Sequence, residues 1–522
     1  MYCDMQAKLF RMHSYAHNNH KRKPLCNILR VILNCDRIAL TKRLTPDILK
    51  YELVKHGSGE VYAVFIGRER ELNRLNEMYE GNKFECAIIY GRRRVGKTSL
   101  IQEFIKDKKA IYFMSLETSE RANLENFSRS IMRIAADSIS VPSSFSSFSD
   151  AFEAIGDLAG EERLILAIDE FPYLANSVQG IASMLQAQID LRYKSSKLFL
   201  ILCGSSMSFM ENQVLGYQSP LYGRRTAQFR VLPFTFFESV SFHEGYDSFD
   251  KAVVYGITGG IPRYLSLIDD KKTLADNVTD CFFDPSSYLF EEPSNLLKQE
   301  LREPQVYNDI IASVATGSSR LNEIATKTGM DTAKCSKYLS SLISLGIIKK
   351  ELPVLEASSK RTSYRLADSM FRFWYRFVPR HSSQILSGEA EEVYKSIEQQ
   401  IPAYMGEVFE EICKQYLWQE NSAKRLPFTF RDAGRWWGTD PIRKIEQEID
   451  IIAYSDEKAI FCECKWTSQP VGRAVLDGLI EKSRMFSFME KHYYLFSKSG
   501  FVDGLASDYS SSVRLISFKD ML

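Results

Sequence analysis

The chain lacks long hydrophobic runs, paired cysteines and an excess of either charge. No apolar run approaches the roughly 18 residues that a bilayer span requires, so we expect no membrane role. The ten cysteines include no C-x-x-C pair and the seven histidines offer no zinc-spaced ligand set, which favours a reduced, cytoplasmic protein without structural zinc. A net charge of +1 excludes a uniformly basic nucleic-acid-binding coat, so any contact with DNA must be local.

The length and the N-terminal composition divide the chain. A chain of 522 residues is too long for one hydrophobic core and predicts about three domains. Residues 1–60 are rich in Lys and Arg and nearly free of acids up to Pro46, which predicts a loosely ordered basic extension. A targeting arm or a nucleic-acid-binding tail is the alternative. Its apolar stretch at 25–33 is broken by Asn27 and Arg30, so it is a poor signal-peptide core.

Short apolar runs alternate with amphipathic stretches from residue 84 onward. This alternation predicts an α/β domain with a parallel sheet and helices on both faces, which we place at residues 61–235. A helical segment at 236–300 is expected to follow it. The predicted strands are residues 84–90, 110–116, 164–168, 198–203 and 227–231.

The second half of the chain begins with helices and ends with strands. Helical spacing at 306–314, 321–328 and 332–345, followed by two strands within 347–366, predicts a winged helix-turn-helix at 301–367. The lysines and arginines on its third helix and its hairpin suit phosphate contacts, although such modules also bind proteins. They are Lys334, Lys337, Lys349, Lys350, Lys360 and Arg361. A helical linker at 368–400 and a further α/β domain at 401–522, with strands at 448–454, 459–464 and 493–496, complete the prediction.

The most specific motif follows the first predicted strand and opens a helix. It reads Gly91-Arg92-Arg93-Arg94-Val95-Gly96-Lys97-Thr98, with Ser99 next. Glycines allow backbone N–H groups to surround phosphate oxygens at a helix N-terminus, which makes the string a phosphate-binding loop. Lys97 is expected to neutralise the β- and γ-phosphates of ATP, and the Thr98 hydroxyl to bind Mg²⁺.

Three later groups are candidates for the chemistry of hydrolysis. Asp169 and Glu170 end an apolar strand, where Asp169 can hold Mg²⁺ and Glu170 can deprotonate the attacking water. Acids capping the next helix are the alternative. Ser205 can reach the γ-phosphate if its strand lies between the first and third strands. Arg224 and Arg225 are candidates for an arginine finger, or else form a solvated pair.

Three further strings accompany the phosphate-binding loop in a fixed order. They are Phe65-Ile66-Gly67-Arg68-Glu69-Arg70-Glu71-Leu72, Ile168-Asp169-Glu170-Phe171 and Thr258-Gly259-Gly260-Ile261-Pro262-Arg263-Tyr264-Leu265. Together the four motifs resemble the archaeal-type P-loop ATPases of the AAA+ and STAND-related group. The resemblance implies that Ile66, Gly67 and Arg68 lie near the adenine and that Pro262 begins a lid segment behind the nucleotide. Residues 1–60 depart from the family's pattern, whose members begin near the first motif.

The same family often continues into a winged helix and a C-terminal domain of unknown function that resembles the PD-(D/E)XK nucleases. The matching residues are Glu410 on a helix, Asp450 near the end of a strand, and Glu463 and Lys465 on the next strand. Asp450 and Glu463 can hold Mg²⁺ while Lys465 steadies the attacking water or the phosphate. Strand alternation places Glu463 and Lys465 on one face, which is either a site or a salt-bridged edge.

These observations lead to one main hypothesis and two alternatives. We expect a cytoplasmic ATPase that hydrolyses ATP to ADP and phosphate and whose nucleotide state moves the winged-helix and nuclease-like modules on DNA. The first alternative is an ATP-gated, Mg²⁺-dependent DNA endonuclease. The second is a slow nucleotide-dependent switch that binds a protein or DNA partner. A homo-oligomer is compatible with each, because an arginine finger acts either in cis or from a neighbour.

Overall fold

The computed structural model describes residues 52–55, 61–135, 144–160, 162–356, 361–441, 443–505 and 512–522. Most of the predicted N-terminal extension and Lys360 lie outside these ranges. Within them, β1 (Glu52–Lys55) pairs antiparallel with β2 (Val61–Val64). Residues 52–55 thus pair with the chain just beyond the predicted boundary, and the loosely ordered extension at residues 1–60 stays a prediction.

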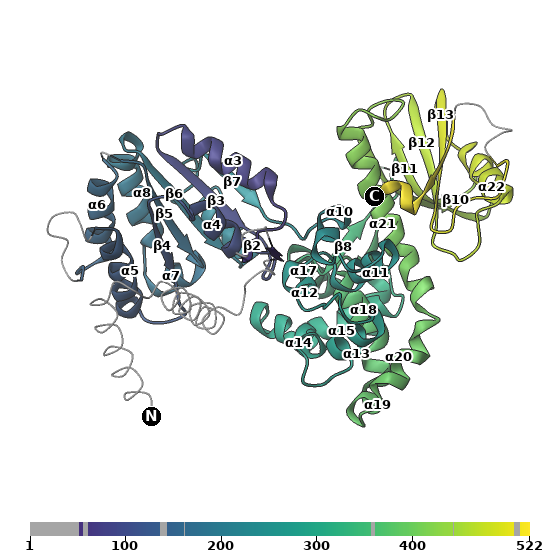
Figure 1. The fold of residues 1–522 in the computed structure, drawn as a ribbon, viewed down its shortest axis with the longest axis horizontal. Coiled ribbons are helices and arrows are strands. Elements are labelled where there is room, and N and C mark those ends of the chain that lie inside the picture. The colour runs from purple at the N-terminus through teal and green to yellow at the C-terminus, as the bar shows by residue number, and fades with distance from the viewer. Residues whose placement is uncertain are drawn as a thin grey trace, which may run out of the picture. The chain divides into compact units, whose positions relative to one another are not determined.

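A five-stranded parallel sheet forms the next part of the chain (Figure 1). Its strands are β3 (Glu85–Tyr90), β4 (Ala110–Met114), β5 (Leu164–Asp169), β6 (Leu198–Gly204) and β7 (Ala227–Arg230), in the spatial order β4-β5-β6-β3-β7. All five strands predicted from the sequence are present. The strand that ends before Ser205 lies between the first and third strands, which is the condition set for a role at the γ-phosphate.

Helices cover both faces of this sheet because β3, β5 and β6 are buried along their full length. Alternate strand residues point to opposite faces and pack into two separate hydrophobic clusters. One face packs against α3 (Glu69–Glu80) and α4 (Lys97–Ile105). The other packs against α5 (Glu120–Ala135), α6 (Phe148–Leu158), α7 (Phe171–Ser177) and α8 (Ile181–Leu191). The predicted α/β architecture is confirmed.

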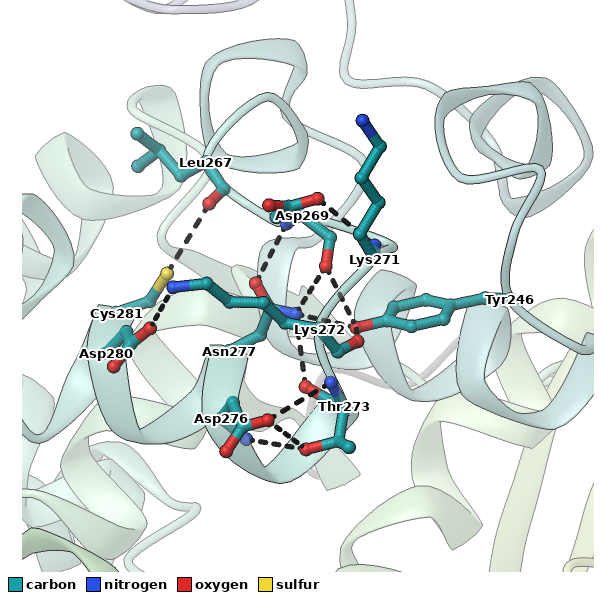
Figure 2. A network of polar contacts seen from close by, with 10 residues as sticks. All are labelled: Tyr246, Leu267, Asp269, Lys271, Lys272, Thr273, Asp276, Asn277, Asp280 and Cys281. Carbon is teal, nitrogen blue, oxygen red and sulfur yellow. Dashed lines mark hydrogen bonds and ion pairs between the residues drawn. The ribbon is translucent and has the colours of Figure 1, made fainter.

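Short helices follow the sheet: α10 (Phe236–Ser239), α11 (Ser248–Thr258), α12 (Pro262–Leu265), α13 (Leu274–Phe282) and α14 (Tyr288–Glu300). A buried asparagine fixes the turn between α12 and α13, as Figure 2 shows. Asn277 donates hydrogen bonds to the Tyr246 hydroxyl at 2.6 Å and the Asp269 carbonyl at 2.8 Å, and it accepts one from the Asp269 N–H at 2.8 Å. Thr273 and Asp276 cap α13 reciprocally. The segment after Pro262 is thereby held in one geometry.

Three helices and a hairpin occupy the region where a winged module was predicted. They are α15 (Pro304–Ala315), α16 (Leu321–Lys327), α17 (Thr332–Ser344) and the antiparallel pair β8 (Ile348–Glu351) and β9 (Ser363–Leu366). Gly329 and Gly346 end α16 and α17 with positive φ angles of 67° and 71°. The predicted elements are all present at nearly the predicted bounds.

The C-terminal part contains a mixed sheet. After α18 (Ser369–Phe377), α19 (Ser382–Leu386), α20 (Ala390–Glu398) and α21 (Ile401–Ser422) come β10 (Asp432–Thr439), β11 (Glu446–Tyr454), β12 (Lys458–Lys465), α22 (Arg473–Ser483), β13 (Glu490–Ser497) and β14 (Val513–Ser517). The spatial order follows the sequence, with antiparallel pairs up to β12 and parallel pairs beyond it. One hydrophobic cluster runs from the helices after the first sheet into this region. No described helix is long and apolar enough to cross a membrane.

Candidate functional site

The loop between β3 and α4 is a tight backbone turn that depends on its glycines. A Cβ atom on Gly91 would lie 2.3 Å from the Val231 carbonyl oxygen, so only glycine fits there. Gly96 caps α4 with a φ of 87°, and Arg94 also has a positive φ of 72°. This conformation directs successive N–H groups into the concavity at the helix N-terminus, which is the geometry of an anion-binding loop.

Lys97 and Thr98 follow this loop and point to two different partners. The buried Lys97 ammonium donates to the carbonyl oxygens of Gly91 and Arg92 at 2.9 and 3.0 Å. The Thr98 hydroxyl donates to Oδ2 of Asp169 at 2.7 Å. Thr98, which follows the loop, and the carboxylate at the end of β5 are therefore in direct contact, and Val95 and Ser99 are buried.

Tyr112 on β4 also contacts Asp169, and sequence reasoning did not identify it. Its hydroxyl donates to the same Oδ2 atom at 2.9 Å. Burial, together with the Asp169 charge, raises the pKa of Tyr112, so the phenol stays protonated and keeps donating. Asp169 is fully buried and oriented by two hydroxyl groups. The only local signal is a tyrosine within a strand that ends beside β5, and many core tyrosines share that signal.

Glu170 and Ser205 meet at the ends of β5 and β6. The Ser205 hydroxyl donates to Oε2 of Glu170 at 3.0 Å, and the Ser205 N–H lies 3.3 Å from the same oxygen. Glu170 has a left-handed backbone with a φ of 50° at the start of α7, while its N–H donates to Asp169 at 2.9 Å. Non-glycine residues rarely adopt this conformation, and such strain is concentrated at functional sites. The structure thus brings the predicted base and the predicted polar residue together.

The first motif and the Gly-Gly-x-Pro segment both contact the loop. Arg68 is buried, donates to the Val95 carbonyl at 3.0 Å and stacks 4.3 Å from the Phe234 ring centroid. Burial lowers its pKa despite the neighbouring Glu71. Ile66 is buried as well, and a Cβ atom on Gly67 would meet Phe234 at 2.7 Å. Pro262 starts α12 and is buried.

The three loop arginines all reach acidic residues of distant elements. Arg92 pairs with Asp368 at the start of α18 at 2.5 Å, and Arg93 pairs with Glu300 at the end of α14 at 2.6 Å. Arg94 pairs with the fully buried Glu292 of α14, which also accepts from the Tyr264 hydroxyl. Each arginine of the phosphate-binding loop is thus connected to a helix downstream of the sheet.

Arg92 retains donors that these contacts leave unused. Its Nε and Nη2 atoms are buried without a hydrogen-bond acceptor among the described residues. Burial alone would lower its pKa, but Asp368, Tyr264 and Glu300 together outweigh burial and raise it, so the guanidinium stays charged. A buried cationic donor without an acceptor is unfavourable by about 1 to 3 kcal/mol, and an anion in the loop would satisfy it.

The predicted finger arginines lie away from these groups. Arg224 forms an ion pair with Asp190 of α8 at 2.5 Å and donates to the Pro220 carbonyl at 2.9 Å. Arg225 donates to the Leu215 carbonyl at 3.5 Å and lies 5.8 Å from the Tyr222 ring centroid. Neither has a described contact with the loop, Asp169 or Glu170. A role for either as a finger stays a prediction.

The acidic residues of the C-terminal part come from three elements. Glu410 on α21 and Asp450 on β11 line one cavity of about 740 Å³. Asp450 accepts a hydrogen bond from the Cys464 N–H at 2.7 Å, next to Glu463 on β12. Glu463 pairs with Lys465 at 2.6 Å, which confirms that these two side chains share a face of the strand. Lys482 on α22 pairs with Glu463 at 3.3 Å and was not identified from the sequence.

Burial and repulsion between neighbouring carboxylates raise the pKa of two of these groups, Glu410 and Asp450. Burial, followed by Asp450, raises the pKa of Glu410 to about 7, and burial with Glu463 raises the pKa of Asp450. Both oxygens of Glu463 are taken by lysines, and the described residues hold no group of three side chains spaced for a metal. With both lysine pairs in place, Glu463 offers no free carboxylate oxygen to a shared Mg²⁺ ion.

Two segments of the chain match known families. Residues 65–268 match a family described as an ATPase domain predominantly from Archaea. Residues 374–475 match a second family, described as archaeal and bacterial proteins of unknown function. An uncharacterized protein of Methanocaldococcus jannaschii is 33% identical over 451 residues, which cover 83% of this chain and 96% of the relative. An uncharacterized ATP-binding protein of the same organism is 48% identical over 46 residues, which cover 9% of this chain and 78% of that protein.

Solved structures also show similarity. The Walker-type ATPase of Pyrococcus abyssi aligns with a TM-score of 0.44 and 19% identity over 64% of this chain and all of that one. The ORC2 protein of Aeropyrum pernix aligns with a TM-score of 0.41 and 14% identity over 64% of this chain and 96% of that one.

Proposed function

Because the chain belongs to the family whose ATPase domain occurs predominantly in Archaea, we propose that it binds and hydrolyses ATP and uses its nucleotide state to control the modules that follow, acting on DNA. The observation that carries the proposal is the contact of Thr98 with Asp169 beside the contact of Glu170 with Ser205. These four side chains meet where parallel strands end, the position at which such sheets bind ligands.

Each residue has a role that follows from its chemistry. The backbone N–H groups of residues 91–96 and the Lys97 ammonium bind the phosphates. Thr98 and Asp169 would hold Mg²⁺, which when bound supplies positive charge to the phosphate oxygens. Glu170 accepts a proton from the attacking water, and Ser205 holds the Glu170 carboxylate in place through its hydrogen bond.

The three loop arginines provide a route from the nucleotide to the downstream helices. Phosphate oxygens and the carboxylates of Asp368, Glu300 and Glu292 compete for the same guanidinium groups. Binding or release of the γ-phosphate then changes the ion pairs that connect the loop to α14 and α18. A ligand shifts a conformational equilibrium only through such differential contacts, and here they are local and specific.

Two finer assignments belong to this proposal. We assign α15 to β9 as a winged helix-turn-helix, supported by three consecutive helices and an antiparallel hairpin. We assign α21 to β14 as a PD-(D/E)XK nuclease-like domain, supported by the element order and by the acidic residues on α21, β11 and β12. We also propose that residues 236–300 form a helical lid and that residues 368–400 form a helical linker.

Steady-state ATPase rates with and without DNA test the proposal. We expect ATP turnover by the purified chain and a change of rate when duplex or branched DNA is added. A chain that binds ATP and turns over slowly regardless of DNA would favour the alternative of a nucleotide-dependent switch. No ATP binding at millimolar nucleotide would contradict the proposal itself.

A second candidate, an ATP-gated DNA endonuclease, is favoured by the placement of Glu410 and Asp450 in one cavity, with Glu463 and Lys465 beside Asp450, and it requires that Mg²⁺ displace a lysine from Glu463. Incubation of the chain with plasmid DNA, Mg²⁺ and ATP tests it. Nicked or linear product that disappears in Lys465→Ala would support it. Cleavage that persists in that variant belongs to a contaminant, and an intact plasmid throughout leaves these residues as a binding or structural group.

A further inference from the structure

A second cavity, of about 530 Å³, is lined by the β8–β9 hairpin, α18, α21 and the strands β10 and β11. We name it the arginine cavity, because all the basic side chains described along it are arginines: Arg320, Arg361, Arg365, Arg372, Arg376 and Arg435. The acidic residues that line it are Glu407 and Glu448. Six positive and two negative groups give it a net charge of +4, whereas the whole chain carries +1.

Internal ion pairs neutralise only part of this charge. Glu407 pairs with both Arg365 and Arg372, Glu448 pairs with Arg435, and Arg361 pairs with Glu356 outside the cavity. Arg320 and Arg376 have no carboxylate within ion-pair distance in the part of the chain that the structure describes. Arg372 also has a buried Nε atom without an acceptor among the described residues. The cavity therefore retains cationic donors for an anionic ligand.

The side chains that line the arginine cavity indicate which anionic ligand it can bind. Guanidinium groups match phosphate oxygens with paired N–H donors, more specifically than a lysine ammonium does. Trp437 lines the same cavity, is only half-buried and lies 5.7 Å from the Arg435 guanidinium. Arginines beside an accessible aromatic ring are the combination that binds single-stranded nucleic acid, through phosphate contacts and base stacking.

The arginine cavity continues toward the acidic residues described above. Arg365, Arg372, Glu407, Arg435 and Trp437 also line the cavity of about 740 Å³ that contains Glu410 and Asp450. Glu407 and Glu410 lie three residues apart on α21, so one helix face serves both cavities. The two cavities therefore share part of their lining.

The hairpin also contacts the C-terminal sheet. The Val354 N–H donates to the Arg435 carbonyl of β10 at 3.0 Å, and Arg361 packs across Gly438. The hairpin thus contacts the C-terminal sheet beside the cavity. The volume of the arginine cavity, about 530 Å³, lies within the range of about 300 to 1,000 Å³ that is typical of small-ligand sites. Such a volume suits a few nucleotides of one strand.

We propose that the arginine cavity binds a single strand of nucleic acid, with phosphates at Arg320 and Arg376 and a base against Trp437. The inference rests on the proposed action on DNA and specifies the form of the nucleic acid. It differs from binding of duplex DNA by α17, whose Lys334 and Lys337 are exposed on another element.

Fluorescence anisotropy with labelled oligonucleotides of about 16 nucleotides tests this inference. The probes are single-stranded DNA, single-stranded RNA and the matching DNA duplex, in EDTA so that no cleavage intervenes. Arg320→Ala/Arg376→Ala should lower single-strand affinity at least about tenfold, because two charged contacts are lost. The slope of log K against log salt should fall by about 1.4, or 0.7 for each phosphate contact. Trp437→Leu should weaken binding while leaving that slope unchanged.

Three controls separate the possible outcomes. Arg380→Ala removes an exposed arginine outside the cavity and should change affinity less than twofold. ATP turnover and thermal unfolding of each variant show that it is folded. Unchanged single-strand affinity in the double variant, or a loss confined to Lys334→Ala/Lys337→Ala, would overturn the inference and leave the proposed ATPase intact. Cavity variants that lose more affinity for the DNA duplex than for the single strands would overturn it too. No binding of any probe by the unmodified chain would instead remove the DNA part of the proposed function.

Discussion

The Thr98 hydroxyl donates a 2.7 Å hydrogen bond to Asp169, although 71 positions separate the two residues. Thr98 is the second residue of α4, and Asp169 is the last residue of β5. The packing of α4 on the sheet therefore sets the distance between them. Tyr112 donates to the same carboxylate oxygen from β4. The site is thus assembled from one helix and two neighbouring strands of the sheet, and single substitutions in it should change chemistry more than folding.

Lys97→Ala should lower ATP turnover by about 10²-fold or more, because it removes a buried cation that is preorganised for the phosphates. Coupled-enzyme ATPase assays measure the rate, and a fluorescent nucleotide measures affinity. Lys106→Ala is the matched control, because Lys106 lies just beyond the same helix, exposed and paired with Glu103. Equal rates for the Lys97 variant and the unmodified chain would rule out the phosphate-binding role.

Glu170→Gln should retain ATP and lose hydrolysis, because an amide keeps the shape of the carboxylate but cannot accept a proton. Ser205→Ala should show a smaller loss, about tenfold, because the base keeps its chemistry and loses one positioning hydrogen bond of 3.0 Å. Single-turnover kinetics with bound ATP distinguish the two variants. If Glu170→Gln hydrolyses ATP at the parental rate, the base is another residue.

Local sequence patterns predicted the parallel sheet and the phosphate-binding loop for a physical reason. Fully buried strands such as β3 and β5 must be apolar throughout, and the loop needs glycine at fixed positions. β10 and β14 were missed. β10 contains Gly434 and Gly438, shifts its register between Gly434 and Trp436, and is mostly half-exposed, while β14 is a short edge strand. Neither carries a clear periodic signal.

The contacts between the loop arginines and their acidic partners could not be predicted either. Arg92 and Asp368 are 276 positions apart, and Arg93 and Glu300 are 207 positions apart. Charged residues are common in any chain, so no spacing identifies such pairs before the fold is known. The same holds for Lys482, which reaches Glu463 from the helix between two strands. Tertiary structure alone creates these pairs.

Gly260→Ala should destabilise the chain by about 3 kcal/mol. Its φ is +67°, and an added Cβ atom would lie 2.1 Å from the Phe234 carbonyl oxygen, so conformational strain and a steric clash add together. Gly180→Ala is the matched control, because Gly180 has a φ of +80° with no atom within 4 Å of a built Cβ. Gly180→Ala should lower the free energy of unfolding by only about 1 kcal/mol. Urea unfolding measures both, and equal midpoints would contradict the predicted clash.

The pair Arg92 and Asp368 should couple nucleotide binding to α18. Asp368→Asn keeps an acceptor for the Phe371 N–H at the start of α18 but removes the charge that competes for Arg92. ATP should therefore bind about three- to tenfold more tightly to this variant, because the guanidinium is released toward the phosphates. Isothermal titration calorimetry on Arg92→Ala, Asp368→Asn and the double variant gives the coupling free energy, which we expect to exceed about 0.5 kcal/mol. The exposed pair Arg121 and Glu125 on α5 provides a control cycle that should show none. Strict additivity at Arg92 and Asp368 would mean that the ion pair is structural and that the nucleotide signal leaves the loop by another route.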